Sequence, residues 1–277
     1  MMKRFQIFPV RARLAPAAAA LALLLGAATG APAMQAPQRS AAAAPAVATV
    51  PFGPGEHAAY QVKLGGISVG SGAMRVTGIQ HIDGHPTYHT RLEVSGGIPL
   101  ARVDDTFESW IDVAGLFSRR FHQDQKEVRY QRKRTYHFFP EHRTWLRPGN
   151  GETGALPTSK PLDDVSFLYY ARTLPLEVGK TYTLHQYFKE DGNPVILKVL
   201  RKERITVPAG TFETIVVRPI IKTKGLFSEG GEAEVYFSDD ARRILVMMRS
   251  KVPLVGSLTL HLRSYTPGQP YTAGAAS

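Results

Sequence analysis

Short segments in which apolar and polar residues alternate dominate the chain from Glu56 onward, separated by Gly, Pro and Asp. The clearest runs from Leu258 to Arg263, where leucines alternate with Thr, His and Arg. A period of two places the leucines on one face of a strand and the polar groups on the other. The pattern predicts an antiparallel β architecture in which strands greatly outnumber helices.

A hairpin is expected before the alternating segment Thr211 to Val217, because Pro208, Ala209 and Gly210 have the composition of a tight turn. One helix is expected near the middle of the folded part. Asp163 and Asp164 are suited to cap it, and Pro175 prevents its continuation. The residues that share one face of this helix are Val165, Leu168, Tyr169 and Arg172.

The two halves of the folded part show a weak internal similarity. Ser95, Ile98, Pro99 and Leu100 correspond to Ser250, Val252, Pro253 and Leu254. The spacing differs by one residue, so this is only a hint of two similar halves.

The N-terminus has the three parts of a secretory signal peptide. Cationic Lys3, Arg4, Arg11 and Arg13 precede an apolar run from Leu14 to Ala28 and the tripeptide Ala31, Pro32, Ala33. The run is short for a membrane-spanning helix, so a signal peptide of residues 1–33, cut after Ala33, is favoured over an uncleaved anchor. We expect a periplasmic protein with no transmembrane segment in the mature chain.

Composition suggests the remaining boundaries. Residues 34–51, rich in Ala and Pro, predict a flexible spacer, residues 52–265 a single all-β domain, and residues 266–277 a flexible tail. The chain has no cysteine, which excludes disulfides and a lipidated N-terminal cysteine. Its formal charge of +11 falls to +7 without the four positive charges of residues 1–33. Anionic lipid or polysaccharide is the expected kind of partner, and export argues against nucleic acid.

Searches for catalytic and metal sites give no candidate. His81, His85 and His89 have a spacing of four, but the Asp83-Gly84 pair between them predicts a hairpin turn, not a helix that would align three ligands. Ser71 lies between glycines but is followed by a strand, unlike a nucleophile elbow. We therefore predict no catalytic residue, no metal and no cofactor.

A basic and aromatic stretch is the most unusual feature. If residues 126–138 form one continuous strand, one face carries Lys126, Val128, Tyr130, Arg132, Arg134, Tyr136 and Phe138. Two guanidinium groups among aromatic rings would suit a phosphate or carboxylate beside an apolar surface. A turn at Gln131 to Lys133 is the alternative, and it would place the charges in solvent.

The order of several motifs resembles the exported bacterial proteins of domain of unknown function 3108. The supporting residues are Phe52, Gly53, Gly55, Glu56, Tyr60, Gly65, Gly66, Ile67, Gly70, Asp164, Ser166, Tyr169, Arg172, Pro208 to Phe212, and Ser238, Asp239, Asp240, Arg242 and Arg243. The resemblance covers residues 52 to about 265 and supplies no catalytic residues. It also implies a possible relation in fold to half-barrel lipoprotein carriers, hence a mainly β protein with a strongly curved antiparallel sheet or half-open β-barrel around one central α-helix.

These observations favour a non-enzymatic envelope protein that holds an apolar or lipid-like ligand on the concave face of its sheet. The ligand-binding candidates are Tyr130, Arg132, Arg134 and Tyr136 for a headgroup, with Leu168 and Tyr169 on the helix. One alternative is a protein-interaction module in envelope assembly, in which an exposed edge strand pairs with a partner. A second alternative, an envelope hydrolase or lyase, would need polar groups that converge in a cleft.

Overall fold

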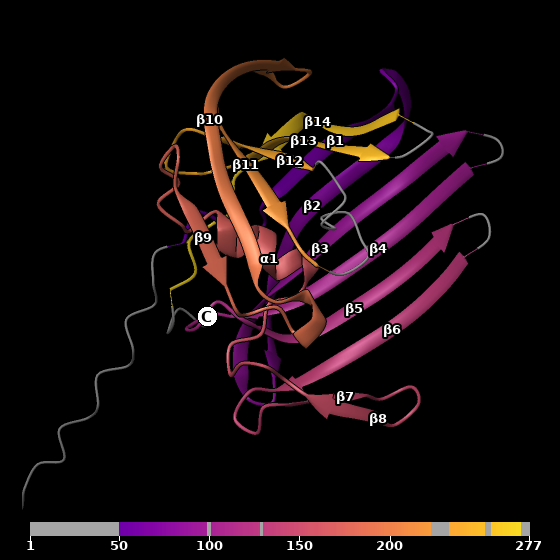
Figure 1. Ribbon diagram of the computed structural model, residues 1–277, viewed down its shortest axis with the longest axis vertical. Helices are drawn as coiled ribbons and strands as arrows, with labels where there is room; N and C mark the ends of the chain where they lie inside the picture. Colours follow the sequence, from indigo (N-terminus) through magenta and orange to yellow (C-terminus); the bar gives the residue numbers. More distant parts are fainter. Residues whose placement is uncertain (1–49, 99–100, 128–129, 223–232, 253–255, 273–277) are drawn as a thin grey trace, which may run out of the picture. The chain divides into compact units, whose positions relative to one another are not determined.

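Strands make up most of the protein in the computed structural model, which describes residues 50–98, 101–127, 130–222, 233–252 and 256–272 (Figure 1). The first eight strands of this part are β1 (His57–Leu64), β2 (Ile67–Ile82), β3 (His85–Ile98), β4 (Ala101–Asp112), β5 (Ser118–Glu127), β6 (Tyr130–Phe139), β7 (Thr144–Arg147) and β8 (Glu152–Ala155). The helix α1 (Asp164–Ala171) follows. The remaining elements are β9 (Thr181–Leu184), the 3-10 turn η1 (Glu190–Gly192), β10 (Val195–Val207), β11 (Gly210–Ile220), β12 (Glu234–Ser238), β13 (Leu245–Val252) and β14 (Gly256–Thr266).

All the described strands belong to one antiparallel sheet in the order β8-β7-β6-β5-β4-β3-β2-β1-β14-β13-β12-β11-β10-β9. The chain starts in the middle of the sheet at β1 and proceeds strand by strand to the edge at β8. It then crosses through α1 to the opposite edge at β9 and returns to β14, which pairs with β1. The sheet is open between β8 and β9, and the connection that contains α1 joins these two edges (Figure 1).

Close contact between β2 and β3 requires glycine at two paired positions. Gly70 pairs with Gly96, and a Cβ on Gly70 would lie 2.1 Å from the carbonyl oxygen of Ser95. A Cβ on Gly96 would lie 2.5 Å from the carbonyl oxygen of Val69, and Gly96 has a φ of +154°. Side chains are thus excluded at this crossing, where the backbones of the two strands approach each other.

The N-terminus of α1 is fixed by a reciprocal capping box. Asp163 accepts hydrogen bonds from the backbone N–H groups of Val165 and Ser166, and the Ser166 hydroxyl accepts one from the backbone N–H of Asp163. The second carboxylate oxygen of Asp163 accepts hydrogen bonds from Ser109 and Ser118, at 2.6 and 2.5 Å. Because these serines belong to β4 and β5, the cap also attaches the helix to the sheet.

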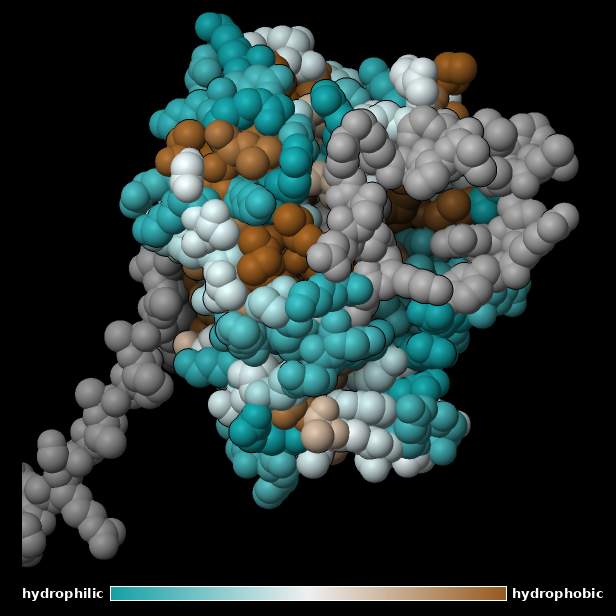
Figure 2. All heavy atoms as spheres, viewed as in Figure 1, coloured by the Kyte–Doolittle hydropathy of each residue, from teal (hydrophilic) through white to brown (hydrophobic). Residues whose placement is uncertain are grey.

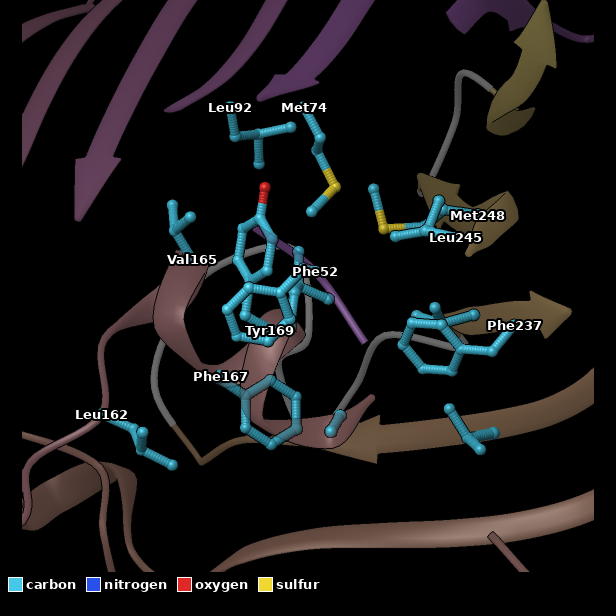
Figure 3. Packing of buried hydrophobic residues seen from close by; sticks show 14 of the residues in the cluster. Phe52, Met74, Leu92, Leu162, Val165, Phe167, Tyr169, Phe237, Leu245 and Met248 are labelled. Atoms are coloured by element: carbon cyan, nitrogen blue, oxygen red, sulfur yellow. The ribbon is translucent and has the colours of Figure 1, made fainter. Parts of the chain in front are cut away.

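Almost the whole surface of α1 is buried. Its fully or nearly fully buried residues are Val165, Ser166, Phe167, Leu168, Tyr169 and Ala171. Figure 3 shows side chains of the helix and of both halves of the sheet, including Leu92 and Met248, in one apolar cluster. A helix buried on nearly all sides serves as the core around which the sheet bends.

A buried ion pair fixes the other end of the helix. Arg172, the C-cap residue, donates to both carboxylate oxygens of Glu56 at 2.6 and 2.9 Å, and each side chain is 3% exposed. Arg172 also donates to the carbonyl oxygens of Pro51 and Arg242, and Tyr265 donates to Glu56. One guanidinium therefore joins the helix to the start of β1 and to the turn before β13.

Most predictions of secondary structure are confirmed. The mainly β fold, the curved sheet around one helix, and the strands at Thr211–Val217 and Leu258–Arg263 are present. The hairpin at Pro208 connects β10 to β11, since Val207 pairs with Gly210. Asp163 is the helix cap as predicted, whereas Asp164 is the first helical residue and accepts a hydrogen bond from Tyr187.

Both interpretations of residues 126–138 need correction. The stretch is not one strand, because β5 ends at Glu127 and β6 begins at Tyr130. A turn at Gln131 to Lys133 is also wrong, since all three residues lie within β6 and pair with β5. Of the similar segments in the two halves, Pro99, Leu100, Pro253 and Leu254 lie outside the described residues.

Candidate functional site

Side chains directly opposite one another on β2 to β6 form rows across the face of the sheet that carries α1. One row consists of Met74, Leu92, Phe107, Gln123 and Arg134. Directly opposite side chains in an antiparallel pair lie about 5 Å apart at Cβ. The row therefore passes from apolar residues on β2 to β4 to an amide and a guanidinium on β5 and β6.

The next row away from the helix consists of Gly72, Val94, Asp105, Gln125 and Arg132. In this row the polar residues begin on β4, at Asp105. The row on the helix side contains Ser109 and Phe121, which are both completely buried, and Ser109 contacts the helix cap. Side chains on β5 and β6 of this face thus change from aromatic beside α1, at Phe121 and Tyr136, to polar or basic in the two rows farther from it.

Several apolar residues on this face are only partly buried. Val94, Phe107 and Leu258 pack against the core without being fully enclosed by it. In Figure 2, patches of hydrophobic atoms are visible among the hydrophilic atoms of the face in view. Apolar side chains beside charged ones can bind a molecule that has an apolar part and a polar part.

Two polar groups of the first row have unused hydrogen-bonding capacity. Gln123 is 6% exposed, and its Oε1 atom is buried without a partner in the structure. Its Nε2 atom donates to Asp164 at 3.5 Å. Arg134, directly opposite, is partly buried and donates no hydrogen bond within the described part of the chain. A buried acceptor and a guanidinium that both lack partners are unusual in a folded interior.

The acidic groups near these residues have other partners. Burial raises the pKa of Asp164, whose Oδ1 atom accepts a hydrogen bond from the Tyr187 hydroxyl at 2.8 Å. Asp105 accepts a hydrogen bond from the backbone N–H of Lys126. Both carboxyl groups thus have hydrogen-bond partners other than Arg134.

The predicted ligand-binding residues lie in three different environments. Arg132 and Arg134 occupy the helix-bearing face of β6, and Tyr130 is the first residue of that strand. Tyr136 is 4% exposed and belongs to an aromatic cluster, with ring centroids 5.1 Å from Phe188 and 5.5 Å from Trp145. The structure thus brings the two arginines to a common face and places the Tyr136 ring in the core.

Leu168 and Tyr169, the two predicted helix residues, are 2% and 0% exposed. Tyr169 packs edge-on against Phe52, with ring centroids 4.8 Å apart. Its hydroxyl is buried and has no hydrogen-bond partner, and Figure 3 shows it pointing to the region between Leu92 and Met74. Burial raises the pKa of this hydroxyl well above its ordinary value.

The three histidines that share a spacing of four do not form a metal site. His81 and His89 are on different strands joined by the turn at Asp83 and Gly84. His89 lies on the opposite face of the sheet, where it contacts Thr77 and Glu108 and stacks on Trp110. The described residues contain no group of three potential metal ligands.

Sequence reasoning did not identify Gln123 or Phe107 as members of the site. Neither residue is unusual in its own strand, and their importance depends on the register between β4, β5 and β6. The register in which Glu127 pairs with Tyr130 places Gln123 opposite Arg134. Recognising this pairing would have placed Gln123 and Phe107 on the face with the arginines.

The fold and site together define an open antiparallel sheet that bends around a buried helix and has one apolar and one basic region on its concave face. The chain belongs to the family described as Protein of unknown function (DUF3108), whose model matches residues 59–263. The resemblance inferred from the sequence motifs is thereby confirmed. A search of curated proteins found none that matches this sequence.

Two solved structures show a distant similarity, each with 11% sequence identity. One is a candidate lipoprotein from Parabacteroides distasonis, with a TM-score of 0.30 over 79% of this chain and 99% of that one. The other is a candidate exported protein with a YmcC-like fold from Bacteroides fragilis, with a TM-score of 0.28 over 79% of this chain and 98% of that one. TM-scores this low support no argument about this chain.

The described residues contain no helix with the length and hydrophobicity of a membrane span.

Proposed function

We propose that this protein is exported to the periplasm and, without catalysing a reaction, holds an apolar or lipid-like molecule on the concave face of its sheet. The observation that carries the proposal is the row in which apolar residues on β2 to β4, ending at Phe107, meet Gln123 on β5 and Arg134 on β6. The partly buried Val94 and Phe107 lie next to this boundary. A ligand with an apolar chain and a polar end matches both regions.

Export is supported by the sequence of residues 1–33, with a cationic start, an apolar run and the small residues Ala31 to Ala33. A periplasmic protein meets lipids and other apolar molecules that need shelter from water. The partly enclosed apolar surface and the positive charge suit this environment.

Apolar contact would supply most of the affinity. Each methylene group removed from water contributes about 0.8 kcal/mol, so a chain of roughly ten carbons contributes about 8 kcal/mol before the entropic cost of binding. A hydrogen bond to a charged group contributes only about 1.5–3 kcal/mol. The apolar half of the face is therefore the part to test first.

The test is binding of a fluorescent fatty-acid probe to purified protein, together with native mass spectrometry after mild extraction. We expect the probe fluorescence to shift and a copurified lipid to appear as added mass. Phe107→Arg places a charge in the apolar region and is expected to weaken probe binding at least tenfold. Thr106→Arg is the matched control, because Thr106 is the adjacent residue on β4 and faces the other side of the sheet.

Absence of both a bound lipid and a probe shift would refute the proposal, as would equal effects of the two variants.

Protein binding through an edge strand is the second candidate, since β8 and β9 are the edges of the described sheet. Each has only four residues, and short edge strands are a common means of preventing strand addition. Capture of one defined envelope protein, abolished by a proline in β9, would favour this candidate over lipid binding.

A further inference from the structure

We propose that Arg134 and Gln123 together bind the headgroup of a phospholipid in which the phosphate is accompanied by an N–H or O–H donor. This inference rests on the proposed function, because the acyl chain of such a lipid would occupy the apolar part of the same face. It adds the chemical class of the ligand and its orientation.

The charge of the headgroup follows from Arg134. This side chain is partly buried on the concave face and has no hydrogen-bond or ion-pair partner within the described part of the chain. A guanidinium presents two parallel N–H donors, which match the oxygens of a phosphate or carboxylate. Arg132 lies two residues away on the same face, which adds positive charge beside the site.

The donor in the headgroup follows from Gln123. Its amide nitrogen points to the Asp164 carboxyl group, to which it donates, so the oxygen is the end left without a partner. A side chain that is 6% exposed cannot satisfy this oxygen with bulk water. A ligand with an ammonium or hydroxyl group next to its phosphate can donate to Gln123 and accept from Arg134.

The acidic neighbours narrow the class further. Asp164 lies next to Gln123, and Asp105 occupies the adjacent row on β4. Two carboxyl groups beside the headgroup site repel a headgroup that carries several negative charges. A phosphate diester with one negative charge and a nearby donor suits this arrangement better than a phosphate monoester.

The orientation of the chain follows from the row of cross-strand neighbours. From Gln123 the row continues through Phe107, Leu92 and Met74. Leu92 and Met74 are only 7% and 3% exposed, so the apolar surface open to a ligand is that of the partly buried Phe107 and Val94. An acyl chain that starts at the headgroup site would therefore lie on Phe107 and Val94, on the β3 and β4 side of Gln123.

Four probes with defined differences test the inference by isothermal titration calorimetry. They are a dodecylphosphoethanolamine, the matching dodecylphosphocholine, which has no N–H donor, dodecanol, which has no phosphate, and glycerophosphoethanolamine, a phosphate diester that has no alkyl chain. We expect the first to bind tightest and the second roughly threefold to tenfold more weakly. The free headgroup should show no measurable binding.

Two variants assign these differences to residues. Arg134→Gln is expected to weaken both alkyl phosphates roughly tenfold to a hundredfold and to leave dodecanol unchanged. Gln123→Leu should abolish the preference for ethanolamine over choline. Lys133→Gln is the matched control, because Lys133 is the adjacent residue on β6, faces the other side of the sheet and is 72% exposed. Circular dichroism would verify that each variant folds. If Arg134→Gln does not fold, Arg134→Lys replaces it, because lysine keeps the positive charge but lacks the paired N–H donors of the guanidinium.

The outcomes separate this inference from the proposed function. If dodecanol and the alkyl phosphates bind equally and Arg134→Gln changes neither, the headgroup inference is wrong and lipid binding stands. If the free headgroup binds as tightly as the alkyl compound, the ligand is a small phosphate compound and the lipid assignment is overturned. If none of the four binds, both proposals fail.

Discussion

The buried ion pair between Glu56 and Arg172 is expected to be the most sensitive polar contact for stability. Glu56→Gln would keep the shape of the side chain while removing the charge that balances Arg172. The two groups are joined by hydrogen bonds of 2.6 and 2.9 Å, and each side chain is only 3% exposed. Loss of one partner from such a pair typically costs about 3–5 kcal/mol, because the remaining charge stays buried.

The local geometry makes relaxation of the pair difficult. Arg172 lies over the rings of Phe52 and Tyr169, with its guanidinium carbon 5.4 Å from each centroid. It also donates to the carbonyl oxygens of Pro51 and Arg242, so movement toward solvent would break these bonds too. We therefore expect the unpaired guanidinium of the Glu56→Gln variant to remain in the interior.

Urea unfolding followed by the fluorescence of the two tryptophans measures this cost. The expected loss of about 3–5 kcal/mol is a large part of the roughly 5–15 kcal/mol typical of folded domains. Arg172→Met alone should also destabilise, but the double variant should lose less than the sum of the single losses, because it leaves no unpaired charge. Glu213→Gln is the control, since its ion pair with Arg204 is mostly exposed and should change stability by under about 0.5 kcal/mol.

A loss below about 1 kcal/mol for Glu56→Gln, or strict additivity in the double variant, would refute the reasoning.

Two further predictions concern the helix. Burial raises the pKa of Asp163 from 3.8 to about 6. Hydrogen bonds from Ser109 and Ser118 lower this pKa, but the effect of burial is larger. The folded state thus binds this proton more tightly than the unfolded state, and the associated stability, up to about 3 kcal/mol, is present below pH ~4 and lost as the pH rises through about 6. Urea unfolding at both pH values should show this loss in the wild type and a smaller one in Asp163→Asn; equal losses would contradict it. Tyr169→Phe removes a buried hydroxyl without a partner and should stabilise the ligand-free protein by about 1–2 kcal/mol in the same assay, whereas a loss of stability would show that the hydroxyl is hydrogen-bonded.

The type of each element could be predicted from the sequence because local signals agree with the fold. Pro208 and Gly210 indicate a turn whatever the surrounding fold, and Asp163 followed by Ser166 indicates the start of a helix. The alternation of Leu258, Leu260 and Leu262 reports one buried face. These signals depend only on neighbours in the chain.

The burial of α1 on almost all sides was not predictable in the same way. The apolar pattern predicts one buried face for the helix, yet Ser166 and Phe167 are also buried. The hydroxyl of Ser166 has its hydrogen-bond partner in the capping box, so this polar residue can be buried without cost to hydrogen bonding. The burial of Phe167 depends on the connection to β9, which brings the C-terminal half of the sheet around the helix.

The position of Arg134 shows where pattern alone fails. Residues 126–138 alternate as one long strand would, and no proline or glycine marks the turn that separates β5 from β6. Only the pairing of the two strands reveals that Gln123 lies opposite Arg134. The sequence could therefore supply the residue types of the site but not the contacts between them.

The order of the strands explains why one concave face can be apolar on one side and basic on the other. The sheet starts at β1 and extends in both directions, so β5 and β6 lie on one side of it and the C-terminal strands on the other. The pairing rows of β11 to β14 contain Val217, Val235, Met248 and Leu260, all buried and apolar. Under the proposed function, the polar end of a bound amphiphile would lie on the side of β5 and β6. Because Glu56 and Arg172 act at the end of the helix, their substitution should lower stability without changing the affinity for alkyl phosphates. Arg134→Gln should instead weaken the binding of alkyl phosphates without lowering stability.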